Sequence, residues 1–102
     1  MKVSLEEIKE KLRESKKDIE KKYKVKIEEI GIFGSYIKKK AKEDSDIDIL
    51  IKFDREAKIS LLDFMKIEMF LTQLLGKKVD LVEKESLKYW IGKKVLGEVI
   101  YV

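Results

Sequence analysis

The sequence contains no cysteine and no histidine. Without these residues the chain cannot form a disulfide, a zinc site of the usual kind, a cysteine nucleophile or a Ser-His-Asp triad. Any chemistry must therefore use carboxylates, hydroxyls, lysines and a metal ion taken from solution. Carboxylate oxygens are the ligands that hard cations such as magnesium or manganese prefer.

Long apolar runs and side-chain amides are also scarce. No apolar stretch approaches the roughly 18 residues that a membrane-spanning helix needs, and the charges within residues 2–7 are untypical of a signal peptide. We therefore expect a cytoplasmic protein that does not contact a membrane. Asparagine is absent and Gln73 is the single glutamine, whereas 43% of the residues are charged. This composition fits a heat-adapted source and a low-GC mesophile equally well.

Length and charge limit the organisation of the chain. A length of 102 residues predicts one domain, spanning 1–102, with a modest core and little room for a second, substrate-binding domain. The net charge is +4 at pH 7, and the lysines are spread along the whole chain. This distribution favours a solvated surface of mixed charge over a nucleic-acid stripe, so we expect no direct binding of nucleic acid.

Periodicity and capping signals predict alternating helices and strands. Ser4 and Glu7 form a capping box for a helix over residues 4–23, and Gly76 is a typical end for a helix that begins at Ser60. In this second helix we expect an apolar stripe of Leu62, Met65, Met69, Leu71 and Leu74. The other expected elements are strands near 29–33, 46–53, 78–82 and 99–102, and helices over 35–41 and 86–96. This alternation alone indicates helices packed against a sheet, an α and β mixed fold.

The most informative pattern joins a Gly-Ser step to an Asp-x-Asp pair. Gly34 and Ser35 lie between an apolar run and a helix-like segment, where free backbone N–H groups bind phosphate readily, although a plain turn with an N-cap serine would look the same. Asp46 and Asp48 are two residues apart on an expected strand, so they project from one face. Two such carboxylates repel each other unless a cation or solvent relieves them. A phosphate cradle beside paired carboxylates predicts magnesium-dependent nucleotidyl or phosphoryl transfer.

Residues 34–48, with Gly-Ser, ten intervening residues and Asp-Ile-Asp, resemble the signature of the polymerase-beta-like nucleotidyltransferases. Within that superfamily the chain resembles the minimal nucleotidyltransferases (MNT), whose domain is about this small. The likeness extends to residues 78–82, which look like the strand of the third carboxylate, and to the tail, 91–101. The resemblance implies an α/β (α+β) fold of the polymerase-beta-like type, a small mixed sheet with helices packed on it. The short link between the first two strands fits that sheet better than a doubly wound one.

The resemblance also assigns roles to individual residues. It implies a catalytic and metal-binding set that holds two magnesium ions, or manganese, made up of Asp46, Asp48 and Asp80. It implies a set that holds the β and γ phosphates of ATP, made up of Gly34, Ser35 and Lys38. Lys38 stands where the family usually has arginine, so it would neutralise phosphate without a bidentate grip. Asp80 could otherwise be a surface carboxylate. Four aromatic residues could stack on the base, contact a partner or pack in the core: Tyr36, Tyr89, Trp90 and Tyr101.

The small size of the chain agrees with an acceptor that brings its own surface. Minimal nucleotidyltransferases resemble the antitoxin half of MNT–HEPN toxin–antitoxin pairs. This resemblance implies a protein adenylyltransferase that moves AMP from ATP to a tyrosine hydroxyl of a HEPN ribonuclease toxin, with which it could form a hetero-oligomer. Two alternatives stay open: a non-catalytic antitoxin that blocks its partner sterically, and an aminoglycoside-type nucleotidyltransferase that acts on a small molecule.

Overall fold

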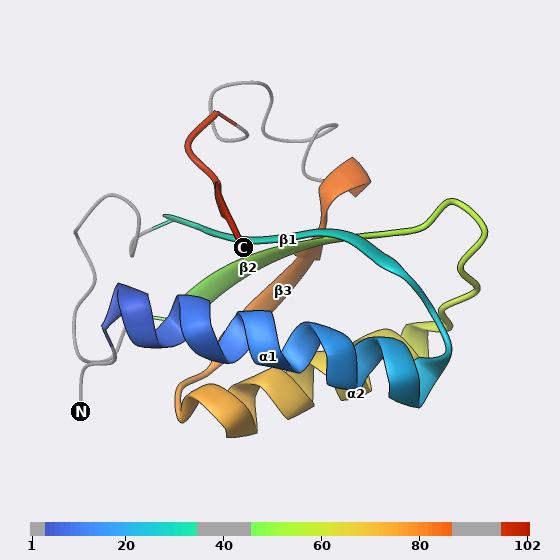
Figure 1. Ribbon diagram of the computed structural model, residues 1–102, viewed down its shortest axis with the longest axis horizontal. Helices are drawn as coiled ribbons and strands as arrows, with labels where there is room; N and C mark the ends of the chain where they lie inside the picture. The colour runs from blue at the N-terminus through green and yellow to red at the C-terminus, as the bar shows by residue number, and fades with distance from the viewer. Residues whose placement is uncertain (1–3, 35–45, 87–96) are drawn as a thin grey trace.

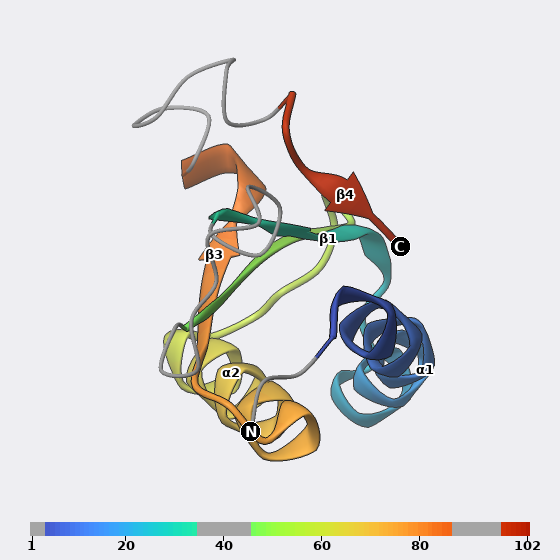
Figure 2. The same cartoon turned by 90° about the vertical axis from the view of Figure 1, so that its left-hand side faces the viewer.

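A four-stranded mixed sheet with two helices on one face organises the chain (Figures 1 and 2). The computed structural model describes residues 4–34, 46–86 and 97–102. Its helices and strands are α1 (Leu5–Tyr23), β1 (Ile27–Phe33), β2 (Ile47–Phe53), α2 (Leu61–Leu75), β3 (Val79–Glu83) and β4 (Ile100–Tyr101). The strand order is β3-β2-β1-β4; β1 is antiparallel to β2 and β4, and β2 is parallel to β3. The predicted small mixed sheet is confirmed.

Both long helices begin, and α2 also ends, where local signals predict. The Ser4 Oγ accepts a hydrogen bond from the Glu7 backbone N–H at 3.2 Å, and the Ser60 Oγ accepts one from the Asp63 N–H at 3.1 Å. Each cap satisfies a backbone donor that the first helical turn leaves free. Gly76 ends α2 in the left-handed conformation, with φ at 70°.

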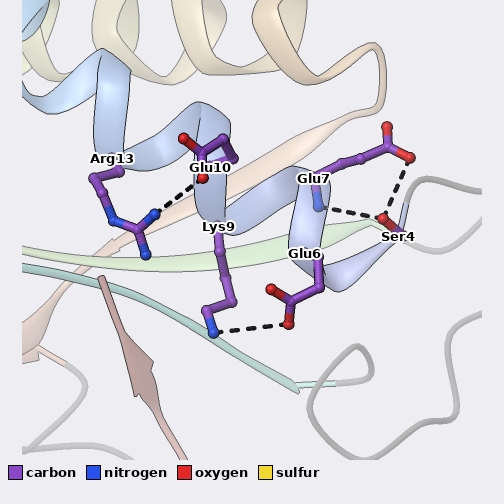
Figure 3. A network of polar contacts seen from close by, with 6 residues as sticks. All are labelled: Ser4, Glu6, Glu7, Lys9, Glu10 and Arg13. Carbon is purple, nitrogen blue, oxygen red and sulfur yellow. Dashed lines mark hydrogen bonds and ion pairs between the residues drawn. The ribbon is translucent and has the colours of Figure 1, made fainter.

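The outward face of α1 is made of charged side chains. Figure 3 shows two of its ion pairs, Glu6 with Lys9 at 3.8 Å and Glu10 with Arg13 at 3.0 Å. Every exposed residue of α1 is charged. The opposite face buries Ile8, Leu12, Ser15 and Ile19.

The predicted apolar stripe of α2 is wrong about which side chains reach the core. Three of its members, Leu62, Met65 and Met69, are exposed. The buried residues are Ile67, Leu71 and Leu75, four apart on the face that packs against the sheet. Apolar residues occur around most of this helix, so sequence spacing could not single out the buried face. No helix in the described part of the chain is long and apolar enough to cross a membrane.

Each of the four expected strands is present in the described part of the chain, with its ends shifted. β1 begins at Ile27, two residues earlier than expected, because Ile27 is buried opposite Phe53 and its N–H donates to the Glu20 Oε2 at 2.8 Å. β4 is confined to Ile100–Tyr101. The expected helix over 35–41 lies outside the described residues. Residues 84–86 are already helical, ahead of the expected start at 86, and 87–96 lie outside the described part.

The two faces of the sheet differ in chemistry. On the helix side Ile47, Ile49 and Ile51 of β2 are fully buried, as their alternate spacing predicts. On the other side Leu50 forms a small buried cluster with Phe33, which Val82 and Val99 cover. Asp48 shares this second face, because it lies two residues from Leu50 on the same strand. The helices therefore fix the sheet from one side and leave the carboxylates on the other.

Candidate active site

Parallel pairing of β2 and β3 brings two aspartates side by side. Asp48 is directly opposite Asp80 in the register of the two strands. The Ile47 N–H donates to the Lys78 carbonyl at 2.9 Å, which fixes this register at the start of both strands. The predicted third-carboxylate strand thus lies next to the Asp-x-Asp strand. Asp46 is exposed immediately before β2 begins.

The surroundings of Asp48 disfavour the ionised form of its carboxyl group. Burial, followed by the negative charges of Asp80 and then Asp46, raises the pKa of the Asp48 carboxyl from 3.8 to about 6. Like charges close together disfavour ionisation of the most buried carboxyl. The three aspartates are therefore one electrostatic cluster, and a cation among them would be favoured.

Gly34 lies against this cluster from the end of β1. Its φ is +79°, a conformation that side chains rarely adopt. A Cβ at this position would lie 2.1 Å from the Asp48 Oδ2, which is far inside contact distance. Only glycine therefore fits between the strand end and the carboxylate, and the backbone itself forms one wall of the candidate site.

Several predicted site residues lie outside the described part of the chain. These are Ser35 and Lys38 of the expected phosphate cradle, and the aromatic residues Tyr36, Tyr89 and Trp90. Tyr101 is described and is 42% exposed, so it is not a core residue. It pairs with Gly31 at the outer strand of the sheet.

An ion pair that the motifs did not indicate lies on the same face of the sheet as the carboxylates. Lys84 forms an ion pair with Glu29 of β1, and its Nζ lies 5.2 Å from the centre of the Tyr101 ring. The hydrogen bond to Glu29 raises the pKa of Lys84. The sequence offers one indication of this contact. Lys84 follows Asp80 and Val82 at alternate residues, and this spacing places the three residues on the same face of a strand.

The residues present fit a magnesium ion by their donor chemistry. They offer carboxylate oxygens only, which suit a hard cation. Burial and then the charges of Asp80 and Asp46 raise the pKa of Asp48, and a cation would offset both effects. Among the residues that the structure describes, no three acidic side chains converge closely enough to hold a metal ion by themselves. The three-aspartate metal site stays a prediction.

The mixed sheet with its paired aspartates defines the class of molecule, a nucleotidyltransferase. The chain belongs to the nucleotidyltransferase domain family, which it matches over residues 7–101, as the resemblance of its motifs predicts. It is 50% identical to the protein adenylyltransferase MntA of Thermococcus cleftensis over 98% of this chain and 97% of that protein. A relative from Methanocaldococcus jannaschii, also named as a protein adenylyltransferase, is 48% identical over 97% and 98% of the two chains.

Solved structures share the fold. A minimal nucleotidyltransferase superposes with a TM-score of 0.65 at 31% identity, covering 89% of this chain and 92% of that one. A toxin–antitoxin crystal structure with AMP-PNP gives a TM-score of 0.71 at 22% identity, covering 91% of this chain and 70% of that one. The first confirms that the chain resembles a minimal nucleotidyltransferase, and the second shows a shared fold.

Replacing Asp48 by Asn should stabilise the free protein at pH 7. The folded pKa of about 6 lies above the ordinary value of 3.8, so the folded chain holds a proton that the unfolded chain has lost. Stability due to this group is therefore present below about pH 4 and is lost as the pH rises through 6. The full shift corresponds to about 3 kcal/mol; solvent screening of a half-buried carboxyl reduces this to about 1 kcal/mol.

Thermal unfolding of the metal-free protein at pH 7 and pH 4 measures this effect. The Asp48→Asn variant should melt roughly 4–8 °C higher than wild type at pH 7 and at the same temperature at pH 4. Asp18→Asn, on the exposed face of α1, is the control and should change neither value. A variant that melts lower at pH 7 would mean that the carboxylate makes a structural contact.

Proposed function

We propose that this nucleotidyltransferase is a protein adenylyltransferase, acts in the cytoplasm, and moves AMP from ATP to a tyrosine hydroxyl of a HEPN-type toxin, which it silences. The observation that carries the proposal is the Asp48–Asp80 pair beside Gly34. The identity with adenylyltransferase MntA over almost the whole of both chains supports transfer of AMP to a protein. The shared fold with a toxin–antitoxin structure that contains AMP-PNP agrees with a nucleotide and a toxin as partners.

Each residue near the carboxylate cluster has a task in this proposal. Gly34 and Ser35 would hold the leaving phosphates through backbone N–H groups and the serine hydroxyl, with Lys38 neutralising their charge. Asp46 and Asp48 would hold magnesium on the nucleotide side of the site, and Asp80 on the acceptor side. Magnesium, when bound, would screen the negative charge that develops on the phosphate oxygens.

The transfer itself exchanges the phosphoanhydride bond between the α- and β-phosphates of ATP for a phosphoester bond to the acceptor. The partner's hydroxyl oxygen forms a bond to the α-phosphorus of ATP, and the bond from that phosphorus to the β-phosphate bridge breaks. Pyrophosphate leaves with the electron pair, and the hydroxyl proton passes toward the Asp80 carboxylate. Asp80 suits this task because it is exposed on β3 while Asp48 beside it is half-buried. No histidine base is needed in such a site, which agrees with a chain that contains none.

Mass spectrometry of a co-expressed pair tests the proposal. The probe is the protein encoded beside this chain's gene, isolated after co-expression and weighed intact. Its mass should rise by whole AMP units with the wild-type chain and stay unchanged with Asp48→Asn. A partner that is neutralised without any mass change would show a binding antitoxin instead. A partner that is left active and unmodified, together with transfer of AMP to an aminoglycoside, would show a small-molecule enzyme.

A further inference from the structure

The outward face of α2 is apolar, unlike the rest of the described surface of the helix layer. Six residues of α2 are exposed, and the four large apolar ones among them are Leu61 (76%), Leu62 (60%), Met65 (52%) and Met69 (61%). The other two are Lys66 and Gln73. On the neighbouring helix α1 every exposed residue is charged, and ion pairs lie along that surface (Figure 3). The exposed surface of α2 is therefore mainly apolar, whereas that of α1, in the same layer, is charged.

The spacing of this apolar surface is that of a helix–helix contact. Leu62, Met65 and Met69 are three and then four residues apart, which is the repeat that aligns side chains along a seam between two helices. Methionine is adaptable and is common at protein-binding surfaces. Beside Leu61 lies a cavity of about 460 Å³. Its lining includes the apolar residues Phe53, Ile59, Phe64 and Leu81, which offer contacts to an apolar anchor, and the polar residues Ser60, Glu83 and Ser86.

The adjacent strand edge disfavours a partner that adds a strand. β3 is an edge strand of the described sheet, but two of its outward N–H groups already have partners on α2. The Val79 N–H donates to the Thr72 Oγ1 at 3.0 Å, and the Leu81 N–H donates to the Glu68 Oε2 at 2.9 Å. An added strand would have to break both bonds. The surface is therefore suited to a helix.

The charges around the apolar stripe disfavour a second copy of this chain. The exposed charged residues on α2 and at its two ends are Lys58, Lys66 and Lys78. The acidic residues of α2 are half-buried, Asp63 in the first turn and Glu68 bonded to β3. In a two-fold dimer the same patch meets itself, so the like charges would be brought together. A partner with acidic residues beside its own apolar stripe would instead be attracted.

We propose that the outward face of α2 (Leu61, Leu62, Met65 and Met69) is a docking surface for an amphipathic, acid-bordered helix of the partner protein. α2 packs on the helix side of the sheet (Figure 2). Asp48 shares the opposite face with Leu50, and Asp80 pairs with Asp48. The partner thus docks at one place and is modified at another, so binding does not depend on the state of the active site. The inference rests on the proposed function only in taking the docked protein to be the one that is adenylylated.

Calorimetric binding of the protein encoded beside this chain's gene tests the docking surface. The double variant Leu62→Glu, Met69→Glu should weaken binding by at least a hundredfold, because it removes the apolar stripe and repels acidic residues. The control, Lys17→Gln with Lys21→Gln on α1, lowers the net charge by the same two units and should bind as wild type does. A neutral variant, Leu62→Gln with Met69→Gln, should also weaken binding while it keeps the melting temperature of wild type.

Unchanged binding by both double variants of α2 would overturn the proposal. The proposal would also be overturned if the wild-type chain sediments as a dimer and the Gln variant sediments as a monomer, since a second copy would then cover the face. Binding of wild type, but not of the Gln variant, to phosphatidylserine vesicles would equally overturn it in favour of a membrane. The Asp48→Asn variant keeps the two proposals apart: it should bind the partner as wild type does while transferring no AMP.

Discussion

An Asp80→Asn variant should lose transfer of AMP while it binds ATP almost as well as wild type. Asp80 is exposed on β3, and β2 separates it from the Gly34 backbone that we propose to hold phosphate. An amide in its place can neither accept the proton of the acceptor hydroxyl nor hold a cation there by charge. Removing a proton acceptor typically slows a reaction by about 10²–10⁴-fold, so we expect a loss of roughly a thousandfold.

Glu83→Gln is the matched control for this variant. Glu83 is an exposed acidic residue of the same strand, three residues away and therefore on the opposite face. Its replacement should change neither transfer nor ATP affinity. Single-turnover transfer and calorimetric ATP titration, run on both variants, separate the outcomes. Transfer at the wild-type rate by Asp80→Asn would remove Asp80 from the mechanism, and loss of ATP binding would place it in the nucleotide cradle.

A Gly34→Ala variant should lose both stability and nucleotide binding. Its φ of +79° disfavours any side chain by about 1–2 kcal/mol, and the new Cβ would also overlap the Asp48 Oδ2 at 2.1 Å. Asp48 must move away to make room, which displaces the carboxylate that the site needs. Together these effects should destabilise the fold by about 2–3 kcal/mol and weaken ATP binding by at least tenfold.

Gly76→Ala isolates the conformational part of that effect. Gly76 has a similar φ of +70°, but nothing lies within 4 Å of the position that a Cβ would take. This variant should lose about 1 kcal/mol of stability, a drop of roughly 4–8 °C in melting temperature, and keep full ATP affinity. Equal effects of the two substitutions on ATP affinity would show that contact between residue 34 and Asp48 does not affect ATP binding.

Sequence reasoning succeeded where the determining interactions are local. The start of α1 and both ends of α2 follow from Ser4, Ser60 and Gly76, each of which acts on residues within one helical turn. The alternation of Ile47, Ile49 and Ile51 with Asp48 likewise indicates that the three isoleucines share one face of β2, and all three are buried. The glycine, paired aspartates and spacing of residues 34–48 were enough to predict the family, which the whole chain then confirms.

Long-range pairing was beyond local reasoning. Nothing near Asp80 in the sequence determines that β3 pairs in parallel with β2. The predicted three-aspartate site therefore had to assume that Asp80 lies beside Asp48, because the sequence alone could not show it. The raised pKa of Asp48 is a consequence of that pairing and of burial. The exposed face of α2 was assigned wrongly because the sheet, and not the helix, decides which apolar residues are buried. This wrongly assigned face is the surface on which the docking proposal rests.

Transfer of labelled phosphate tests the central claim most directly. The chain, magnesium and the protein encoded beside its gene are incubated with ATP labelled at either the α or the γ phosphate, and the partner is then counted. Attack at the α-phosphorus keeps the α label on the partner and releases the γ label in pyrophosphate. We therefore expect label on the partner from α-labelled ATP alone, lost with Asp48→Asn. Label from γ-labelled ATP would show a phosphoryl transferase, and no label on a neutralised partner would show an antitoxin that acts by binding; either result would contradict the account.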